Sequence, residues 1–600
     1  MQNTRKLRRL VLAGLMALGT YGLSATAFAA DAGLHVDQVG YLTNHTKVAM
    51  VSAASGDSFK LVDVKTGKTV YEGKLTAAKY DANSAENIRR ADFTNFNTPG
   101  EYKLVVGDKE SYDFAIGDNV YNVPLVQNLR SYTLSRSGNP FKDEVTGLEV
   151  KQGHAQDARA KTYFGDKLNQ KGDILDVSGG WYDAGDYGKY TTTAGLASAE
   201  ILLAYEANPT HFTKGQLHFP KGVKSDGKLP DVLAEVKHEL KWMQKMQRSD
   251  GSTFHKVAGA QWPGFDKSPD TDTQERLIYG TATYSSAIYG ASMAIAARVF
   301  YPYDKEYAEQ LLKNARAVWS YLEKTPQPVY RWDEGQENGS GPYDKKTDAE
   351  ERAWLAAELF KTTGDKSYEQ YLQKTQSGLL TQKPGFFTWD NTLSLAQFAY
   401  LTNNAADKSL QGKVKTAFLA YADDIVKKIE KDGFASSLSA SEYTWASTKN
   451  AVSQGDHLLM ANLIAPDKKY VEGALDQIHY LFGRNVLNRS FMTGVGDNPP
   501  EHPHNRIHES TGAYVPGLVV GGPNAVSGGD PDQTKYLEGG NIPPAKAYLD
   551  VLTSWSTNEY AIDYNSAAAY ALAFFAKADS SIKPVDLKLN RVFPPLNKNK

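Results

Sequence analysis

Two aspartates stand three residues apart in a stretch rich in glycine and aromatic residues. Asp183 and Asp186 could together hold and activate a water molecule, and hydrolysis of a glycosidic bond also needs a carboxylic acid across that bond. Flat aromatic rings cover the apolar face of a sugar ring, so Trp181 and Tyr187 are candidate stacking residues. A Ca²⁺-binding loop is the alternative interpretation of this stretch, because acidic, glycine-rich loops bind Ca²⁺ readily.

Two later stretches use the same residue types. The first contains His504 and Arg506, whose side chains can donate hydrogen bonds to sugar hydroxyls. The second contains Asp550 and Glu559, followed by Tyr564. Acidic, basic and aromatic side chains therefore recur at three places far apart in the chain, as expected if folding gathers them into one site.

In this order, the three stretches resemble glycoside hydrolase family 9, also called cellulase family E. The run Gly-Trp-Tyr-Asp-Ala-Gly-Asp-Tyr-Gly at 180–188 is similar to the family's base-bearing loop, and Pro-His-Asn-Arg at 503–506 is similar to its sugar-binding loop. Residues 550–565 resemble the segment that holds the general acid. The run His-Val-Asp-Gln-Val-Gly-Tyr at 35–41 resembles the N-terminal immunoglobulin-like module of one branch of the family.

The resemblance implies a role for each matched residue. Asp186 would be the general base of an inverting hydrolysis, Asp183 would hold the same water, and Glu559 would be the general acid. His504 would act at the same centre, while Asp550 would either orient the local structure or take a direct part. The further candidates for contact with substrate are Arg506, His255, Tyr443, Trp445 and Tyr564. The three rings among them could equally belong to the hydrophobic core.

The apolar pattern changes near residue 120. Short runs at 47–51, 59–64, 102–106 and 112–116, separated by turn residues, predict strands. They fit a small immunoglobulin-like β-sandwich, which we place at residues 31–118. The chain beyond has apolar residues at helical spacing, which predicts helices at 229–243, 307–322, 349–360, 392–401, 412–431, 452–464, 471–482 and 566–576.

Stacked helices joined by long loops favour an α-helical toroid with its function on the loop face. The family resemblance specifies this as an (α/α)₆ barrel, which we place at residues 121–580, so the fold class is mainly α. The remaining residues, 581–600, form a Lys- and Pro-rich tail that we expect along the surface.

The start of the chain has the features of a secretory signal peptide. A basic segment precedes the apolar run Leu10–Leu23, and Ala-Phe-Ala at 27–29 fits a cleavage site before Ala30. We therefore predict a signal peptide at 1–29 and a secreted or periplasmic protein. With 67 basic and 69 acidic residues, the charge indicates neither nucleic acid nor membrane as partner, and we expect a monomer.

The absence of cysteine bears on metals. It removes disulfides and thiolate zinc ligands together. Many family members have Arg-Cys-Gly where this chain has Arg-Ser-Gly at 136–138, so we do not expect the structural zinc of some relatives. The implied chemistry requires no cofactor. A structural Ca²⁺ remains open, because carboxylate-rich loops are plentiful although no EF-hand spacing is present.

The sequence thus predicts an exported inverting hydrolase of β-1,4-glucosidic bonds, of the endoglucanase type. Two alternatives stay open at this point. One is an exo-acting relative, such as a cellobiohydrolase, a cellodextrinase or an exo-β-glucosaminidase, since loops that block one end of a cleft decide between endo and exo action. The other is a non-catalytic sugar-binding protein on the same fold.

Overall fold

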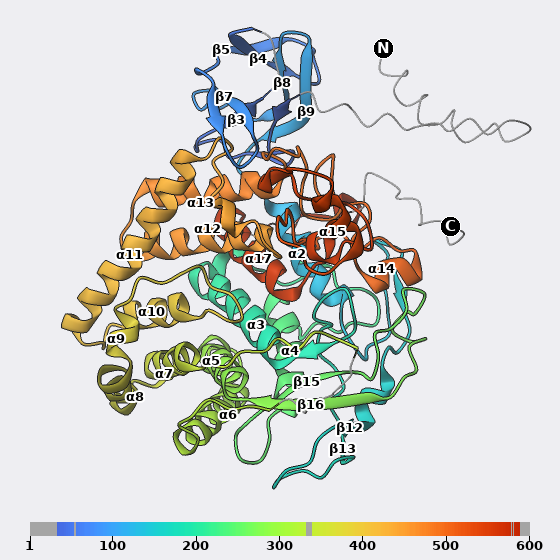
Figure 1. Cartoon of the computed structure of the whole chain (residues 1–600), viewed down its shortest axis with the longest axis vertical. Helices are drawn as coiled ribbons and strands as arrows, with labels where there is room; N and C mark the ends of the chain where they lie inside the picture. The colour runs from blue at the N-terminus through green and yellow to red at the C-terminus, as the bar shows by residue number, and fades with distance from the viewer. Residues whose placement is uncertain (1–32, 53–55, 332–338, 578, 580, 588–600) are drawn as a thin grey trace, which may run out of the picture.

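The computed structural model describes residues 33–52, 56–331, 339–577, 579 and 581–587. The predicted signal peptide and residues 588–600 of the predicted tail lie outside these ranges. Figure 1 shows a small β-domain on top of a larger helical body. Among the described residues, no helix combines the length and apolar character that crossing a membrane requires.

The N-terminal domain is a β-sandwich, as predicted. Its two sheets enclose a core that includes Phe59, Leu61, Leu104 and Phe114. The four-stranded sheet has the order β1 (Leu34–His35), β3 (Val48–Val51), β7 (Glu86–Asp92) and β6 (Lys79–Asp81). The five-stranded sheet has the order β2 (Gly40–Tyr41), β9 (Lys109–Ile116), β8 (Gly100–Val106), β4 (Ser58–Asp63) and β5 (Thr69–Lys74).

The helical body is the predicted (α/α)₆ barrel. Its inner helices are α3 (Thr191–Ala207), α5 (Thr283–Phe300), α7 (Ala349–Thr363), α10 (Leu393–Leu401), α12 (Ser447–Ile464) and α17 (Ile562–Phe575). Each packs against the next, and α17 closes the ring on α3. The outer helices, each in contact with one or two inner helices, are α4 (Asp231–Lys245), α6 (Lys305–Lys324), α8 (Lys366–Tyr371), α11 (Lys408–Lys431), α13 (Lys468–Leu481) and α2 (Asn122–Leu134).

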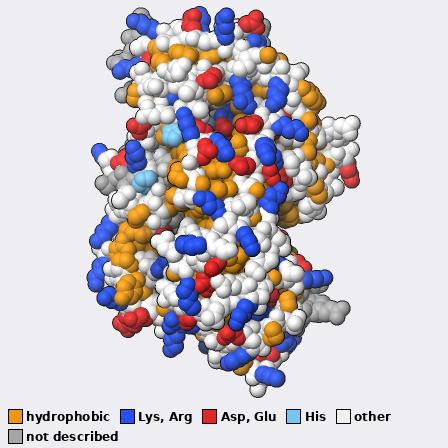
Figure 2. Space-filling model, turned by 90° about the vertical axis from the view of Figure 1, so that its left-hand side faces the viewer, with side chains coloured by type: hydrophobic (Ala, Val, Ile, Leu, Met, Phe, Trp, Pro, Cys, Tyr) orange, Lys and Arg blue, Asp and Glu red, His pale blue; other side chains and the backbone are white. Residues whose placement is uncertain are grey.

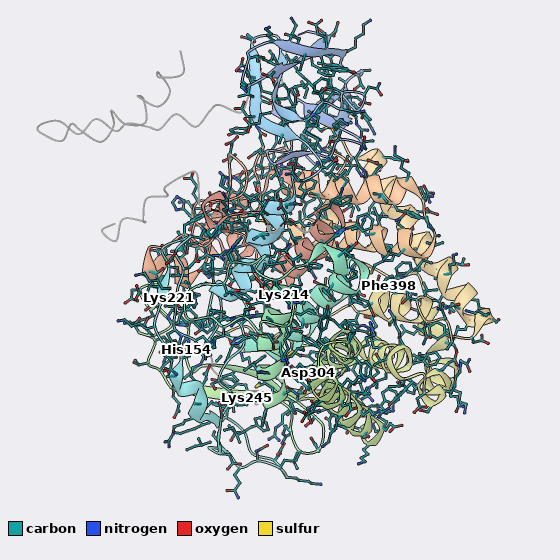
Figure 3. The ribbon with its side chains drawn as sticks, turned by 180° about the vertical axis from the view of Figure 1, so that it is seen from behind. His154, Lys214, Lys221, Lys245, Asp304 and Phe398 are labelled. Carbon is teal, nitrogen blue, oxygen red and sulfur yellow. The ribbon has the colours of Figure 1, made fainter. Side chains whose placement is uncertain are left out.

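The inner and outer helices differ in how much of their surface is buried. In α3 every residue from Thr191 to Tyr205 is buried, whereas α6 buries one stripe that includes Leu311 and Leu322. Figure 3 labels residues of both kinds, with Lys245 and Asp304 at outer helices and Phe398 on inner helix α10. The eight predicted helices are confirmed to within about five residues at their ends. Helices α2, α3, α5 and α8 were missed; burial on nearly all sides weakens the period of α3 and α5, although the equally buried α12 and α17 were predicted.

Long loops at one end of the barrel carry shorter elements. A small sheet has the order β13 (Ile174–Leu175), β12 (Ala160–Thr162), β16 (Arg276–Ala282), β15 (Phe254–Gly259) and β14 (Lys189–Tyr190), and β17 (Tyr330–Arg331) pairs with β16. The C-terminal loops contain α14 (Arg506–Thr511), α15 (Pro531–Glu538) and α16 (Trp555–Asn558). On the face drawn in Figure 2, basic and acidic side chains are interspersed, in keeping with a net charge of −2.

Two consecutive side chains of the β-sandwich reach into the barrel. Asp37 accepts hydrogen bonds from the hydroxyl of Tyr121 at 2.9 Å and from Nδ1 of His479 at 2.8 Å. Oε1 of Gln38 accepts from the backbone amides of Asp497 and Asn498, both at 2.9 Å. Through Gln38, the sandwich therefore holds the loop that contains Asp497 and Asn498 and continues to residues 503–506.

Replacing Gln38 tests this contact. Gln38→Ala removes the acceptor of two backbone amides, and we expect the free energy of unfolding to fall by about 2–3 kcal/mol. Thermal unfolding should show the loss as a lower Tm. The matched control is Lys74→Ala on the exposed edge strand β5, which should leave Tm unchanged. An identical Tm for the two variants would contradict this role of Gln38.

Candidate active site

Backbone hydrogen bonds join the three stretches singled out in the sequence. The amide of Ile562 donates to the carbonyl of Asp183 at 2.8 Å, and the amide of Arg506 donates to the carbonyl of Gly185 at 3.0 Å. His504 and Glu559 form a parallel β-bridge. A Cβ placed on Gly185 would lie 2.1 Å from the carbonyl oxygen of His504, so only glycine fits here. Three distant loops therefore form one continuous unit.

This unit forms part of a cleft of about 1100 Å³ at the loop end of the barrel. The segments that precede helices α3, α7, α10, α12 and α17 supply much of its wall. Of the predicted site residues, those that line it are Asp183, Asp186, His504, Arg506, Glu559, Trp445 and Tyr564. A cleft of this size with converging polar groups suits a small or polymeric ligand.

Asp183 lies at the base of the cleft and is held by two hydroxyl groups. Thr193 donates to Oδ1, and Tyr343 donates to Oδ2 at 2.8 Å. Burial raises the pKa of Asp183 to about 8, although the hydrogen bond from Thr193 acts in the opposite direction. The negative charges of Asp563 and Asp186 also raise this pKa.

Asp186 has more cationic surroundings. Its Oδ1 accepts from the amide of Gly188 at 2.5 Å. Burial raises the pKa of Asp186, while the positive charges of Arg506, Lys256 and Arg276 lower it. The pKa of Asp186 stays raised overall, but of the two aspartates Asp186 is the one whose ionised form neighbouring cations stabilise.

Glu559 lies across the same unit. Its Oε1 accepts from the amide of Gly185 at 3.1 Å, and its side chain is 15% exposed. Burial raises the pKa of Glu559 well above its ordinary value, and the negative charge of Asp186 adds to the effect. A carboxyl in this position keeps its proton near neutral pH and can donate it.

His504 and Arg506 are fixed by backbone carbonyls. Nδ1 of His504 donates to the carbonyl of Leu552 at 2.6 Å, which leaves Nε2 facing Oε1 of Glu559 at 3.9 Å. Burial lowers the pKa of His504 to about 4, so the ring is neutral. The guanidinium of Arg506 donates to the carbonyls of Pro263 and Gly185, at 2.8 and 3.1 Å.

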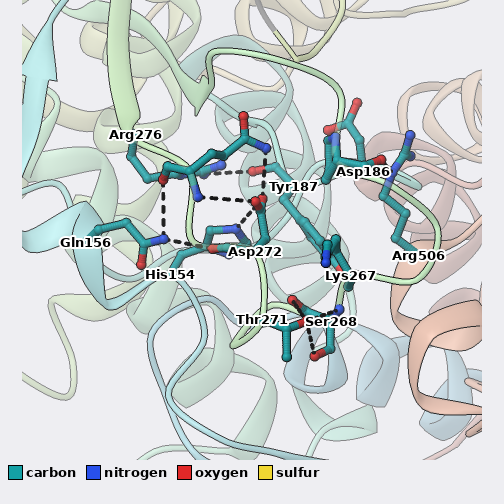
Figure 4. Close-up of polar contacts among 12 residues, drawn as sticks. His154, Gln156, Asp186, Tyr187, Lys267, Ser268, Thr271, Asp272, Arg276 and Arg506 are labelled. Carbon is teal, nitrogen blue, oxygen red and sulfur yellow. Dashed lines mark hydrogen bonds and ion pairs between the residues drawn. The ribbon is translucent and has the colours of Figure 1, made fainter.

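A network of hydrogen bonds and ion pairs behind the loop of Asp183 and Asp186 holds the backbone of Tyr187 (Figure 4). Arg276 donates to the carbonyl of Tyr187 at 2.8 Å and to Asp157 at 2.7 Å. In the same network, His154 lies 3.2 Å from Asp272. Both Arg276 and Asp157 are buried, so this ion pair is shielded from solvent. The loop is thereby held from behind as well as from the cleft.

Four predicted stacking or binding residues are buried and do not line the cleft in this structure. Trp181 packs in the core and donates through its indole to Glu235 at 2.8 Å. Tyr187 and Tyr443 are 1% and 2% exposed, and His255 is fully buried. A ring rich in apolar surface serves core and sugar equally well, so its residue type alone did not distinguish the two.

Asp550 is also outside the cleft. Its carboxylate accepts from the amides of Glu501 and His502, at 2.8 and 3.0 Å, and pairs with Arg489 at 2.7 Å. These contacts agree with the first of the two predicted roles, orientation of local structure. Asp550 is therefore a positioning residue for the loop that continues to His504.

Sequence reasoning also missed residues that line the cleft. Lys449 and Asp563 lie in the first turns of α12 and α17, with their charged atoms 3.6 Å apart. Missed aromatic residues of the wall are Trp262, Phe265, Tyr343, Trp389 and Trp555. Trp262 is 55% exposed, as a stacking ring has to be. Trp262 and Phe265 lie in one of the long aromatic loops between helices, and this position is the sequence feature that could have identified them as cleft residues.

The residues that stand where some relatives have zinc ligands have other partners here. Ser137 replaces a thiolate and lies 3.5 Å from Oδ2 of Asp157. The ring nitrogens of His154 contact the hydroxyl of Tyr182 at 2.6 Å and Asp272 at 3.2 Å. Throughout the described part of the chain, no three His, Asp or Glu side chains are grouped so that they could hold a metal ion.

Comparison with known sequences identifies the family. The sequence profile of Glycosyl hydrolase family 9 matches residues 121–572, and that of the cellulase N-terminal Ig-like domain matches residues 29–111. The chain belongs to glycosyl hydrolase family 9. It is a glycoside hydrolase of the cellulase type, in the branch with an N-terminal Ig-like domain.

Characterised relatives of this family 9 hydrolase align along most of its length. Endoglucanase D of Acetivibrio thermocellus is 33% identical over 557 residues, which is 92% of this chain and 84% of that protein. The crystal structure of the family 9 endoglucanase J30 is 44% identical, with a TM-score of 0.88 over 90% of this chain and all of the other. A thermostable endoglucanase from Alicyclobacillus acidocaldarius is 27% identical, with a TM-score of 0.81 over 90% and 99% of the two chains.

The close approach at Gly185 yields a test of the site's architecture. In Gly185→Ala the new methyl group must displace the backbone of His504, and with it the loops of Asp186 and Glu559. A shift of about 1 Å costs roughly 100-fold in activity, so we expect at least this loss of kcat/KM together with a lower Tm.

Gly412→Ala is the matched control. Gly412 lies exposed in helix α11 with nothing within 4 Å of a Cβ, so this variant should keep its activity. Its stability should be equal or higher by up to about 1 kcal/mol. Full activity in Gly185→Ala would show that the loops tolerate displacement.

Proposed function

We propose that this family 9 hydrolase cleaves β-1,4-glucans with inversion, with Asp186 as general base and Glu559 as general acid. The observation that carries the assignment is the contrast in their surroundings within one cleft. Burial raises the pKa of both groups, but three cations oppose this effect at Asp186, whereas Glu559 has one such cation, Arg506, and the added negative charge of Asp186. Two carboxyl groups whose environments push their pKa values apart make an acid and base pair.

Asp183 completes the water site in this proposal. Its Oδ2 is held by Tyr343 and its Oδ1 by Thr193, so the carboxyl group is fixed in one orientation next to Asp186. Water held between the two aspartates would attack the anomeric carbon from the side opposite the leaving oxygen. Glu559 would give its proton to that oxygen. Because the ring of His504 beside Glu559 is neutral, it adds no positive charge that would favour loss of this proton before the reaction.

Endo action is the form of the activity that we propose. Endoglucanase D and J30, both named as endoglucanases, align over nearly the whole chain. The aromatic wall offers several stacking surfaces, with Trp262 and Phe265 beside Arg506, and Trp445 beside Tyr564. We further propose an exported monomer, since the cleft is built from one chain and the N-terminus resembles a signal peptide.

We propose that no metal takes part in the chemistry. Two oxygen acids and one water suffice for inverting hydrolysis, and the residues that stand where some relatives have zinc ligands have other partners here. A structural Ca²⁺ would act on stability alone, through its affinity for the folded state.

Replacing Glu559 tests the general acid. Glu559→Gln should lower kcat on cellohexaose by about 10²–10⁴-fold, because the leaving oxygen no longer receives a proton. A glycoside with an activated phenol as leaving group needs little protonation, so its turnover should fall far less. Steady-state rates on both substrates, with folding checked by circular dichroism, make the comparison. Equal losses on the two substrates would exclude Glu559 as the acid.

Replacing Asp186 tests the base and the stereochemistry. Asp186→Ala should abolish turnover of activated and ordinary glycosides alike, because attack by water is common to both. Azide can occupy the vacated space as a nucleophile, and we expect a glycosyl azide of inverted configuration by NMR. A product of retained configuration, or full activity without azide, would contradict the inverting assignment.

A further inference from the structure

The segment from Ser340 to Tyr343 lies directly against both aspartates of the cleft. At one end, the hydroxyl of Tyr343 donates to Oδ2 of Asp183 at 2.8 Å. At the other, Ser340 packs so tightly on Gly188 that a Cβ there would lie 2.9 Å from the Cβ of Ser340. The amide of Gly188 is the donor to Oδ1 of Asp186. The position of this segment therefore bears on both carboxyl groups that would hold the attacking water.

The backbone of this segment is fixed by side chains, one carbonyl after another. Nζ of Lys256 donates to the carbonyls of Ser340 and Gly341, at 3.1 and 2.9 Å. The carbonyls of Pro342 and Tyr343 accept from Nε2 of His255, at 2.8 Å, and from the hydroxyl of Tyr284. All four carbonyls thus have side-chain donors from the barrel.

The backbone at Tyr343 shows why such anchoring is needed. Its φ is +47°, in the left-handed region that a bulky side chain rarely adopts. A conformation of this kind persists only where the surrounding structure holds it. Here it directs the phenol ring between Tyr190 and Trp389, with centroid distances of 4.6 and 5.1 Å, and towards Asp183.

Lys256 is the charged member of these anchors. It lies on β15 opposite Tyr190 of β14 and is fully buried. Its ammonium faces the rings of Tyr190 and Tyr279, at 5.3 and 5.2 Å, and the charges of Asp186 and Asp183. Burying an ammonium group is costly unless hydrogen bonds and opposite charges compensate, so its retention beside the cleft indicates a specific use.

We propose that Lys256 is a positioning residue for the attacking water: it fixes the Ser340–Tyr343 segment, which in turn orients Asp183 through Tyr343 and closes on the loop of Asp186. The inference rests on the proposed function, in which these aspartates hold the water. Lys256 does not line the cleft and would not contact substrate. Its charge has a second effect, because it favours the ionised form of Asp186.

The primary test is Lys256→Met, which keeps the length of the side chain and removes the ammonium group. We expect kcat/KM to fall roughly 10- to 100-fold through kcat, as displacement of positioned groups does. The acid limb of the pH profile should also move to higher pH. Burial lowers the pKa of Lys256 to about 7, so the ammonium is charged throughout that limb and its removal raises the pKa of Asp186.

A double-mutant cycle separates positioning from a general loss of stability. Tyr343→Phe removes only the hydroxyl that reaches Asp183. If Lys256 acts through this segment, the double variant should lose little more activity than the more damaged single variant. Multiplying losses would contradict the proposal, and so would a Lys256→Met enzyme with a lower Tm but an unchanged rate and pH profile.

Two further variants complete the design. Lys256→Arg keeps the charge but changes the geometry of the side chain. It should therefore lower kcat and leave the acid limb of the pH profile in place. It substitutes for the primary test if Lys256→Met does not fold. Lys245→Met, at the exposed end of α4 (Figure 3), is the control and should match the parent enzyme. Asp186→Ala in the same assay separates failure of the proposed function from failure of this inference. An active Asp186→Ala enzyme would refute the proposed function. An inactive Asp186→Ala enzyme together with unaffected Lys256 variants would refute this inference alone.

Discussion

The site depends on one close contact between backbones, the passage of His504 against Gly185. This contact brings the Asp186 loop within hydrogen-bonding distance of the Glu559 segment, and it leaves no room for a side chain. Bonds between backbone groups, from Arg506 to Gly185 and from Ile562 to Asp183, also join these loops, so their placement does not depend on the rotamer of any surface residue. Rigid placement of this kind is what hydrolysis by two opposed carboxyl groups requires.

Differences in neighbouring charge then give these similar acidic side chains different pKa values and different roles. Asp183, Asp186 and Glu559 share the cleft with other acidic side chains, and burial raises the pKa of each of these three. Arg506, Lys256 and Arg276 counteract this effect at Asp186, whereas Glu559 lies next to the negative charge of Asp186. The roles of acid and base thus follow from neighbours supplied by distant parts of the chain.

The sequence allowed the fold class to be predicted, and it singled out three acids that the structure brings into one cleft, because helical periods and loop motifs are local patterns. Helices α3 and α5 escaped, and burial on nearly all sides weakens their period. The stacking candidates Trp181 and Tyr187 have neighbours in the chain that line the cleft, while their own rings turn into the core. The anchoring of Tyr343 by Lys256 joins residues about ninety positions apart, which no local pattern encodes.

Several inner helices begin at the cleft: α3 directly follows Tyr190, and the first turns of α12 and α17 contain Lys449 and Asp563. Each helix start carries a partial positive charge from its aligned peptide dipoles, worth about 0.3–1 kcal/mol to a nearby anion. Their convergence gives the cleft a background potential that stabilises carboxylates whatever the loops contain. The barrel thereby offsets part of the repulsion among the acidic residues that its loops bring together.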